Sequence, residues 1–383
     1  MLKSSFSRRC FLSVGLSGLA GVSAVALGKH KYFMHHSIAL DKSRDFKVTD
    51  FTPLKKRAAA KGLVYGAAAM RDYLLSDKNL EASFIRECNI LVPENDLKWD
   101  ALRPAPNKFN FSQADWLAQF ATRNGMLFRG HTLVWHQQLP QWFKEVVNRQ
   151  NAEKFLVEHI TTVTKRYAGR MHSWDVVNEA IEPDDGLKGG WRRSPWFEFL
   201  DSDYIELAYR TAANADNKAM LVYNENDLEY DTPKHEAKRT LVLKLLERLK
   251  SKGTPIHALG IQSHLKGETR LNAKKLRSFL ADVASLGLKI LVTELDVLDE
   301  QLPNDLQQRD RIVAACYEDY LSVVLSERAV IAVLTWGLSD RRTWLSMFNR
   351  PNKQVRPLPL DSNLSRKLVW NAMARAFDSA PKR

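Results

Sequence analysis

The chain has 383 residues, of which 45% are hydrophobic and 26% are charged, with 17 glycines and 14 prolines. This composition is typical of a globular protein with a sizeable core and excludes a disordered or fibrous chain. The formal net charge of +13 indicates a basic solvated surface, with an acidic polymer or a negatively charged cell surface as the functional alternatives.

The first 26 residues have the pattern of a signal peptide. Arg8 and Arg9 precede an apolar stretch rich in small residues, and Ala24-Val25-Ala26 matches an A-x-A cleavage pattern. The Ser-Arg-Arg-x-Phe-Leu core resembles a bacterial twin-arginine signal, so we predict a protein that is exported to the periplasm or secreted. The alternative is an uncleaved anchor helix, for which the stretch is short. After cleavage we expect no stable membrane association.

Residues 27–50 are predicted to be a polar linker, and no other run is apolar enough to span a membrane. Cleavage of the signal would leave Cys88 and Cys316. Both fall in predicted helices without motif spacing between them, so buried thiols are expected rather than a disulfide.

From about residue 51 a short apolar strand, a loop and an amphipathic helix alternate repeatedly. The clearest helix, residues 232–253, opens on Thr232-Pro233 and closes at Gly253. Strands are predicted at residues 62–69, 89–95, 127–135, 173–180, 219–226, 258–265, 289–296 and 331–338.

Eight strands rich in β-branched residues and separated by helices favour parallel pairing. Eight is also the number that closes a (β/α)8 TIM barrel. The alternative, an open doubly wound sheet, is weakened because no Gly-rich phosphate turn follows the first strand. The sequence therefore predicts an α/β protein in which residues 51–383 form a single barrel domain.

Polar residues recur where the predicted strands end, and in a parallel barrel these ends meet on the rim that carries active sites. From the second strand to the eighth they are Glu94, Asn95, Lys98; His131, Trp135, His136, Gln138; Asn178, Glu179; Asn224, Glu225; Gln262, His264; Glu294, Asp296; and Trp336.

Glu179 ends the apolar run "SWDVVNEA", where a carboxylate is costly to desolvate without a partner or a task. Glu294 occupies the equivalent place on the predicted seventh strand, across the ring from the fourth. Two opposed carboxyl groups suit the cleavage of a glycosidic bond, in which one protonates the departing oxygen and the other attacks or stabilises the anomeric carbon. The alternative is that each glutamate pairs with a lysine or arginine of the rim.

Six segments occur in the order "VPENDLKW", "RGHTLVWHQQLPQW", "WDVVNEAI", "WRRSPWFEF", "IQSHL" and "TELDV". Together they resemble glycoside hydrolase family 10, the endo-β-1,4-xylanases, from about residue 50 to the C-terminus. The resemblance implies a (β/α)8 fold and a retaining double displacement. It also implies that Glu179 is the acid/base and Glu294 the nucleophile.

The neighbouring residues fit such a reaction. His264 can hold an ionised Glu294 by hydrogen bonding, and Asp296 can orient that imidazole. Glu179 has to begin protonated, and we expect the charge of Glu294 to raise its pKa until the glycosyl-enzyme forms. Asn178 is expected to hydrogen-bond the 2-hydroxyl of the sugar that is cleaved.

The resemblance also implies a set of residues that bind the sugar on the non-leaving side: Glu94, Asn95, Lys98, His131, Trp135, Gln138 and Gln262. The rings of Trp336 and Trp344 offer flat faces to pyranose rings, with core packing as the alternative. A metal pair of His131 and His136 is rejected, because residues five apart on a strand point to opposite faces. We expect no metal and no cofactor.

Two segments depart from the family's pattern. In "YNEND", Asn226 stands where the family usually has Tyr, and Asp227 stands at the following Asn. In "SDRRTW", Arg341 and Arg342 replace a pair that is more often neutral, polar or aromatic. We hypothesise that these arginines recognise glucuronic acid branches of xylan, and the alternative is a solvated pair.

The sequence therefore predicts an exported, monomeric, retaining endo-β-1,4-xylanase whose partner is a polysaccharide. One alternative is a barrel glycosidase that acts on β-1,4-glucan. Another is a carbohydrate-binding protein that keeps the cleft without turnover, which the intact Asn178, Glu179, His264 and Glu294 argue against. A nucleic-acid partner is not expected, because the positive charge is scattered and no binding motif accompanies it.

Overall fold

Eight parallel strands close into a barrel in the part of the chain that the computed structural model describes, residues 44–348 and 354–383. Each of β1 to β5 pairs with the next strand along the chain, β6 pairs with β8, β8 with β9, and β9 returns to β1. The strands of this ring are β1 (Val64–Ala69), β2 (Ile90–Pro93), β3 (Leu127–Gly130), β4 (Ser173–Asn178), β5 (Met220–Glu225), β6 (Ala258–Ile261), β8 (Lys289–Leu298) and β9 (Val330–Thr335). The predicted (β/α)8 barrel is confirmed.

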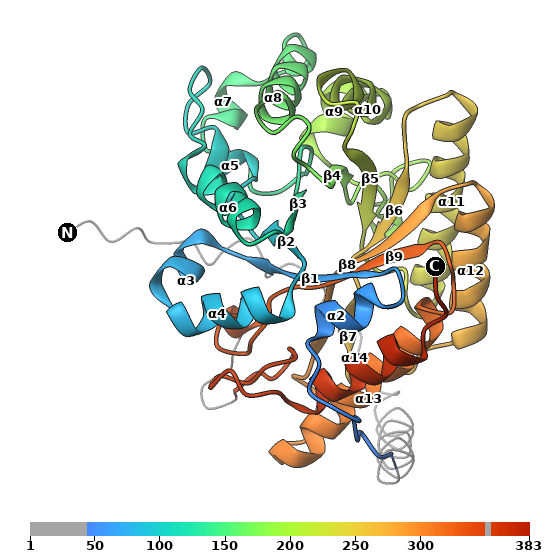
Figure 1. Ribbon diagram of the computed structural model, residues 1–383. Helices are drawn as coiled ribbons and strands as arrows, with labels where there is room; N and C mark the ends of the chain where they lie inside the picture. Colours follow the sequence, from blue (N-terminus) through green and yellow to red (C-terminus); the bar gives the residue numbers. More distant parts are fainter. Residues whose placement is uncertain (1–43, 349–353) are drawn as a thin grey trace, which may run out of the picture. The chain divides into compact units, whose positions relative to one another are not determined.

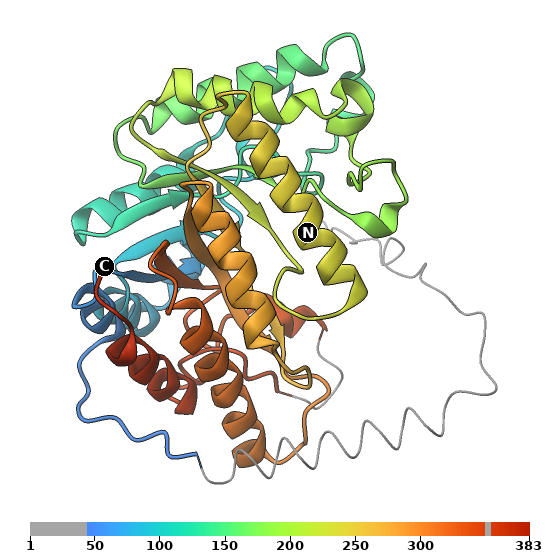
Figure 2. The ribbon, with the colours of Figure 1, turned by 90° about the vertical axis from the view of Figure 1, so that its right-hand side faces the viewer.

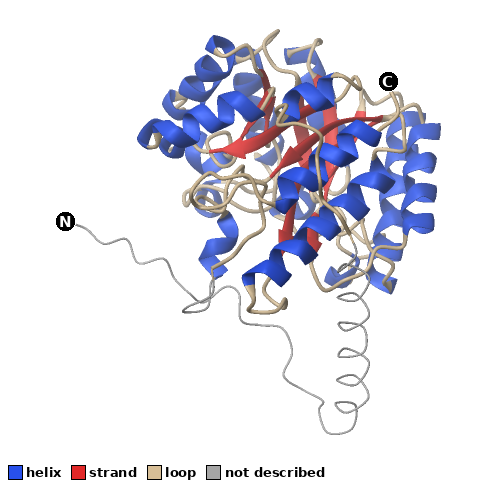
Figure 3. Ribbon diagram, turned by 60° about the horizontal axis from the view of Figure 1, so that its bottom comes forward, coloured by secondary structure: helices blue, strands red, loops and turns tan. Residues whose placement is uncertain are grey.

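Helices surround this ring of strands on its outside (Figures 1 and 3). They are α2 (Leu54–Ala59), α3 (Arg71–Ser76), α4 (Lys78–Glu87), α5 (Trp99–Leu102), α6 (Ser112–Arg123), α7 (Phe143–Val146), α8 (Ala152–Arg166), η1 (Pro183–Asp185), α9 (Pro195–Leu200), α10 (Asp203–Ala215), α11 (Pro233–Ser251), α12 (Ala273–Ser285), α13 (Leu306–Val324), η2 (Trp344–Phe348) and α14 (Leu368–Ser379).

The helix predicted most clearly from the sequence is α11. The Thr232 hydroxyl accepts a hydrogen bond from the backbone N–H of His235 at 3.4 Å, and Pro233 occupies the first turn, where its missing N–H costs nothing. Figure 2 shows α11 and α12 side by side on the outside of the barrel.

One predicted strand, residues 258–265, is wrong as a single element. It is divided into β6, which ends at Ile261, and β7 (His264–Lys266), which pairs with β8 outside the ring. Ser263 lies between them with a φ of 67°, and a left-handed residue interrupts a strand. The third predicted strand is also too long, because β3 ends at Gly130 and not at residue 135.

The interior of the barrel is filled with apolar side chains. Ile90 and Val92 of β2, Val222 of β5, Leu291 of β8 and Leu334 of β9 belong to one buried cluster. Such a filled interior leaves the loops at the carboxyl ends of the strands as the place for a site.

A glycine is required where β3 meets β4. A side chain at Gly130 would lie 2.0 Å from the ring of Trp174, so only a residue without a Cβ allows this indole to pack against the neighbouring strand.

The signal predicted for residues 1–26 lies outside the described residues, and so does most of the linker predicted for residues 27–50. The compact unit that holds the barrel extends from Phe46 to Arg383. Phe46 is buried, and Asp50 forms an ion pair with Arg57 of α2. None of the described helices is long and apolar enough to cross a membrane. No disulfide joins Cys88 to Cys316.

Candidate active site

Glu179 follows the last residue of β4 in a left-handed backbone conformation, with a φ of 56°. Its N–H donates to the carbonyl of Asn224 at 2.9 Å, and its own carbonyl accepts from Nε of Arg192 at 2.6 Å. A non-glycine residue with this φ is uncommon, and such conformations cluster at functional sites. The turn points the side chain over the mouth of the barrel.

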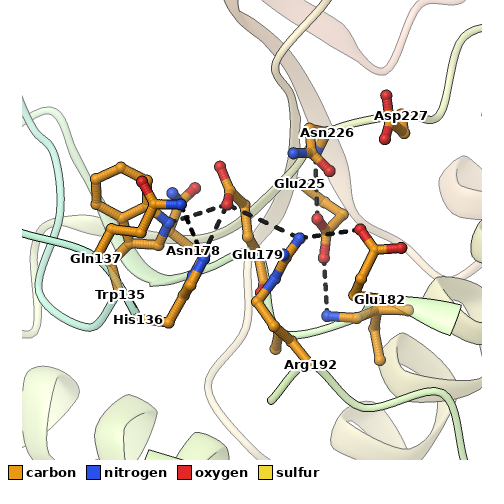
Figure 4. A network of polar contacts seen from close by, with 12 residues as sticks. Trp135, His136, Gln137, Asn178, Glu179, Glu182, Arg192, Glu225, Asn226 and Asp227 are labelled. Atoms are coloured by element: carbon orange, nitrogen blue, oxygen red, sulfur yellow. Dashed lines mark hydrogen bonds and ion pairs between the residues drawn. The ribbon is translucent and has the colours of Figure 1, made fainter. Parts of the chain in front are cut away.

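The Glu179 carboxylate is almost completely buried, with 8% of the residue exposed. Its Oε1 accepts from Nε2 of Gln262 at 2.9 Å, and its Oε2 accepts from the indole N–H of Trp135 at 3.0 Å. Nδ1 of His136 and Nη2 of Arg192 each lie 3.9 Å from Oε2 (Figure 4). Both oxygens therefore face hydrogen-bond donors or positive charge.

Glu294 lies within β8 and is 5% exposed. Its Oε1 accepts from Nδ2 of Asn224 at 2.7 Å, and its Oε2 lies 3.3 Å from Nε2 of His264. Nδ1 of the same imidazole lies 2.8 Å from Asp296. Asp296 in turn accepts from the indole N–H of Trp344 at 2.8 Å, so the His264 ring is held from both sides.

Three amide side chains connect the two carboxylates. Nε2 of Gln262 donates to Glu179 and also to Oδ1 of Asn178, at 3.2 Å. Nδ2 of Asn224 donates to that same Oδ1 at 2.9 Å and to Glu294. Glu179 and Glu294, predicted from the ends of two separate strands, therefore belong to one hydrogen-bonded site.

Glu294 is held ionised. Burial alone would raise the pKa of its carboxyl. The hydrogen bond from His264, the positive charges of His131 and His264, and the hydrogen bond from Asn224 instead lower this pKa to about 2. Burial would likewise lower the pKa of His264, but Asp296 and Glu294 raise it well above its usual range. A negative oxygen beside a held imidazolium can attack an electron-poor carbon.

The expected rise in the pKa of Glu179 is wrong for the free site. Burial does raise the pKa, but the charge of Arg192 and the hydrogen bonds from Gln262 and Trp135 lower it below its usual value. The charge of His136 adds to this only in acid, because burial lowers the pKa of that imidazole to about 4. The expectation considered the charge of Glu294 and not the cations on the other side. These groups stabilise the carboxylate form of Glu179.

The sequence profile described as glycosyl hydrolase family 10 matches residues 53–376. The chain belongs to this family. It is 33% identical to endo-1,4-beta-xylanase B of Thermotoga neapolitana, covering 78% of this chain and 83% of that protein. It is 35% identical to a beta-1,4-xylanase of Dictyoglomus thermophilum, covering 74% and 80%.

Among solved structures, xylanase 10B of Thermotoga petrophila RKU-1 in complex with xylobiose has a TM-score of 0.79 at 32% identity, covering 87% of this chain and 99% of that one. The chain spans 30% of the length of another relative, endo-1,4-beta-xylanase C of Paenibacillus barcinonensis, at 33% identity.

In this family 10 chain most of the residues predicted to bind the non-leaving sugar follow β2 and β3, whereas Gln262 follows β6 and contacts Glu179 and Asn178. Nζ of Lys98 and Nε2 of Gln138 both donate to Oδ1 of Asn95, at 3.0 and 3.2 Å. The Lys98 ammonium also lies 4.9 Å from the centre of the Trp135 ring. These contacts fix polar groups at the mouth of the barrel.

Glu94 lies in the same group and is 9% exposed. Burial raises the pKa of its carboxyl to about 7, the charge of Lys98 opposes the rise, and the charges of Asp96, Asp296 and Glu294 add to it. Since the folded-state pKa lies above the ordinary value of 4.5, ionisation of Glu94 destabilises the fold as pH rises from about 4.5 to 7.

We therefore expect Glu94→Gln to raise the thermal midpoint relative to wild type at pH 8 and to have a smaller effect at pH 4.5. The glutamine keeps the size of the side chain but cannot ionise. Thermal unfolding of both proteins across this pH range measures the difference, and a gap that does not grow with pH would contradict the assignment.

The two predicted tryptophans differ in burial. Trp336 is 6% exposed and belongs to the apolar cluster inside the barrel, and its ring centre lies 5.2 Å from that of His131. Trp344, at the start of η2, is half-buried beside His264, at 5.2 Å between ring centres. Packing in the core therefore explains the position of Trp336, whereas Trp344 lies at the rim of the barrel.

Both histidines of the third segment lie beside Glu179 or Glu294, so the argument that placed them on opposite faces is wrong. Residues 131–136 follow β3 and are not part of a strand. Nδ1 of His131 lies 2.9 Å from Asp175 and 4.0 Å from Glu294, while His136 lies beside Glu179. Within the described ranges, no group of three or more His, Cys, Asp or Glu side chains is arranged to hold a metal ion.

Several site residues were given no task by the sequence. Asn224 and His136 were among the polar residues noted at the ends of predicted strands, but no contact with either glutamate was predicted for them. Arg192 is in a loop 13 residues after Glu179. No periodicity in the sequence indicated that this loop brings Arg192 back to Glu179. Asp175 lies inside the apolar run of β4, where it forms ion pairs with Arg129 and His131.

The two arginines of "SDRRTW" have different surroundings. Nη1 of Arg341 forms an ion pair with Asp77 at 2.6 Å, and its Nε donates to the carbonyl of Ser362 at 2.6 Å. Arg342 is exposed, and its guanidinium lies 5.0 Å from the centre of the Tyr73 ring.

Proposed function

We propose that this family 10 enzyme is a retaining endo-β-1,4-xylanase that hydrolyses internal xylosidic bonds of a polysaccharide. The observation that carries the proposal is the pairing of an ionised nucleophile candidate, Glu294, with a second buried carboxylate, Glu179, in one amide-linked site. The names of the relatives, xylanases from several organisms, support xylan as the substrate.

In the first step an oxygen of Glu294 forms a bond to the anomeric carbon while the bond from that carbon to the glycosidic oxygen breaks. Glu179 gives its proton to the departing oxygen. In the second step the Glu179 carboxylate takes a proton from water, and the water oxygen displaces Glu294 from the anomeric carbon. Two displacements on one carbon retain its configuration.

The residues around the glutamates have separate tasks in this scheme. Asp296 orients the imidazole of His264, and His264 holds Glu294 in its attacking form. Because Oδ1 of Asn178 accepts from two amides, its Nδ2 group is left to donate to the 2-hydroxyl of the sugar. The groups that lower the pKa of Glu179 favour its role as the base of the second step.

Glu94, Asn95, Lys98, His131, Trp135, Gln138 and Gln262 bind the non-leaving part of the chain in this proposal, and Trp344 offers it a ring face with Trp336 beneath. The experiment that tests the function is product analysis from unbranched xylan and from a cellulose-type polymer. Early release of mixed xylo-oligosaccharides indicates internal cleavage of xylan. Faster release from the glucan would instead support the alternative substrate, and no release from either would support a binding protein.

We also propose that residues 1–26 are a twin-arginine signal that directs the folded enzyme to the periplasm or the medium. The pattern Arg8-Arg9, the apolar small-residue stretch and Ala24-Val25-Ala26 support this. A location outside the cytoplasm agrees with a polymeric substrate that a bacterium cannot take up whole.

The hypothesis of glucuronic acid recognition now rests on Arg342 alone. Arg341 forms an ion pair with Asp77, whose side chain also caps the start of α4. Arg342 is exposed over Tyr73, and the pKa of the Tyr73 hydroxyl, raised first by burial, is raised further by the charge of Glu94. Nδ2 of Asn95 also donates to the sulfur of Met70 at 3.6 Å, and Met70 is the N-cap residue of the helix that carries Tyr73. Arg342 therefore lies over a helix that contacts the residues proposed to bind the non-leaving sugars.

We expect Arg342→Ala to lower kcat/KM on glucuronoxylan by about 3- to 10-fold while changing it little on neutral arabinoxylan, because one exposed charge-assisted contact is lost. Arg341→Ala is the comparison. It removes an ion pair at the start of α4, so its main effect is a lower thermal midpoint. Equal slowing of both substrates by Arg342→Ala would contradict the hypothesis.

A further inference from the structure

The loop after β5 carries Asn226 beside the charged groups that surround Glu179. Arg192 lies 3.9 Å from the Glu179 carboxylate and 3.4 Å from Glu182. The carboxylate of Glu225, the last residue of β5, accepts a hydrogen bond from the backbone N–H of Asn226 at 3.1 Å. Figure 4 shows Asn226 on the side of this network where the Glu179 carboxylate lies.

The orientation of the Asn226 amide is fixed by Lys238 of α11. Lys238 is completely buried, and its ammonium lies 3.0 Å from Glu225 and donates a hydrogen bond to Oδ1 of Asn226. Glu225 is itself held by the Tyr223 hydroxyl at 2.5 Å and the N–H of Ile181 at 3.1 Å. A lysine has only donors, so the oxygen of the amide must face it.

The amide nitrogen of Asn226 therefore points away from Lys238. The residue is half-buried, and across residues 44–348 and 354–383 no side chain or carbonyl accepts a hydrogen bond from its Nδ2 group. An amide group with one end anchored and the other end unused is a preorganised donor.

This donor lies on the leaving-group side of the site. Lys238, which holds Asn226, lies 3.9 Å from Glu182. Glu182 lies 3.4 Å from Arg192, and Arg192 lies 3.9 Å from the Glu179 carboxylate. A chain of polar contacts therefore joins Asn226 to the Glu179 side of the site. Since Glu179 protonates the departing oxygen in the proposed function, the polar groups clustered on its side face the sugar that departs.

We propose that Asn226 determines how the leaving sugar is bound, by donating a hydrogen bond from its amide nitrogen to an oxygen of that sugar in an orientation that Lys238 fixes. The inference rests on the proposed function. At this position, where the family usually has a tyrosine, Asn226 offers a directional polar contact. Such a contact favours sugars that present a hydroxyl group at one place.

The test compares substrates with and without a leaving sugar. For Asn226→Ala we expect kcat/KM on xylopentaose to fall about 3- to 10-fold, the effect of one lost hydrogen bond. On a 4-nitrophenyl xylobioside, whose leaving group is not a sugar, the loss should stay within about 2-fold. Products of xylopentaose cleavage should also shift toward those with fewer sugars on the leaving side.

Asn226→Asp tests whether the hydrogen bond donated by the amide matters, or only the shape of the side chain. The carboxylate keeps the size of the side chain and the contact with Lys238, but it has no N–H to offer, so it should be as impaired on xylopentaose as the alanine variant. Asn217→Ala is the matched control, because this exposed asparagine precedes β5 at the opposite end of the strand and should behave as wild type.

Equal losses on both substrates would overturn the proposal, because Asn226 would then act through Glu179 or the fold. Unchanged kinetics in Asn226→Ala, or wild-type rates in Asn226→Asp, would also overturn it. A wild type that cleaves only cello-oligosaccharides would instead refute the proposed substrate. The Asn226 comparison would then be made on those oligosaccharides and their aryl glycosides.

Discussion

Glu294→Ala should lower kcat on xylan by a factor on the order of 10⁴ or more, because it removes the carboxylate that attacks the anomeric carbon in the proposed function. Asn224 and His264 would keep their positions but would face an empty space. Reducing-sugar release from xylan, followed over hours at high enzyme concentration, measures the residual rate.

Glu294→Gln distinguishes the nucleophile from its packing, because the amide oxygen can still accept from Asn224. It should be as inactive as the alanine variant. Glu145→Gln, an exposed glutamate of α7, is the control and should keep wild-type activity. A glutamine variant with more than about one hundredth of the wild-type rate would contradict a nucleophilic role for Glu294.

The same variant has a stability signature. The folded-state pKa of Glu294 is about 2, below the ordinary 4.5, so its carboxylate stabilises the fold fully above pH 4.5 and loses this contribution as pH falls toward 2. The difference in thermal midpoint between wild type and Glu294→Gln should therefore be largest above pH 4.5 and shrink in acid.

The barrel itself could be predicted because its physical signals are local. Each strand is a largely apolar run such as residues 173–177, and many of the polar residues of the site lie at the carboxyl end of a predicted strand. Parallel pairing then brings Glu179 and Glu294 to one rim whatever the details of the loops. Helix α11 was equally clear, because Thr232 and Pro233 mark its start in the sequence.

What the sequence did not predict depends on backbone turns and on distant partners. The left-handed conformation of Ser263 divides a strand whose residue pattern is continuous. Arg341 pairs with Asp77, 264 positions earlier in the chain. No spacing rule connects such residues, so their roles become visible only when the barrel brings them together.

The electrostatics of the acid/base illustrate the same limit. A like charge on Glu294 was a sound reason to expect a raised pKa for Glu179. The structure adds Arg192 from a loop, and its charge, together with the hydrogen bonds from Gln262 and Trp135, prevails over burial. His136, from an irregular segment, adds its charge only in acid. The site therefore favours the anion at both carboxylates, and the first step depends on the fraction of enzyme in which Glu179 carries a proton.

Glu179→Ala should consequently affect different substrates to different extents. On xylan, whose leaving oxygen needs a proton, the rate should fall by about 10³- to 10⁴-fold, the upper range for a lost general acid. A 2,4-dinitrophenyl xylobioside needs no such proton, so its first step should survive and give a burst of dinitrophenol. The second step then lacks its base, and the glycosyl-enzyme on Glu294 should accumulate.

Sodium azide tests the second step of this variant directly. Azide is already an anion, needs no base and is small enough for the space left by the carboxylate, so it should restore turnover of the dinitrophenyl substrate. It should have no comparable effect on wild type. Because azide replaces Glu294 at the carbon that Glu294 had attacked, the product should be the β-xylobiosyl azide, which proton NMR identifies. An α-azide, or no acceleration by azide, would mean that Glu179 does not serve as the acid/base of a double displacement.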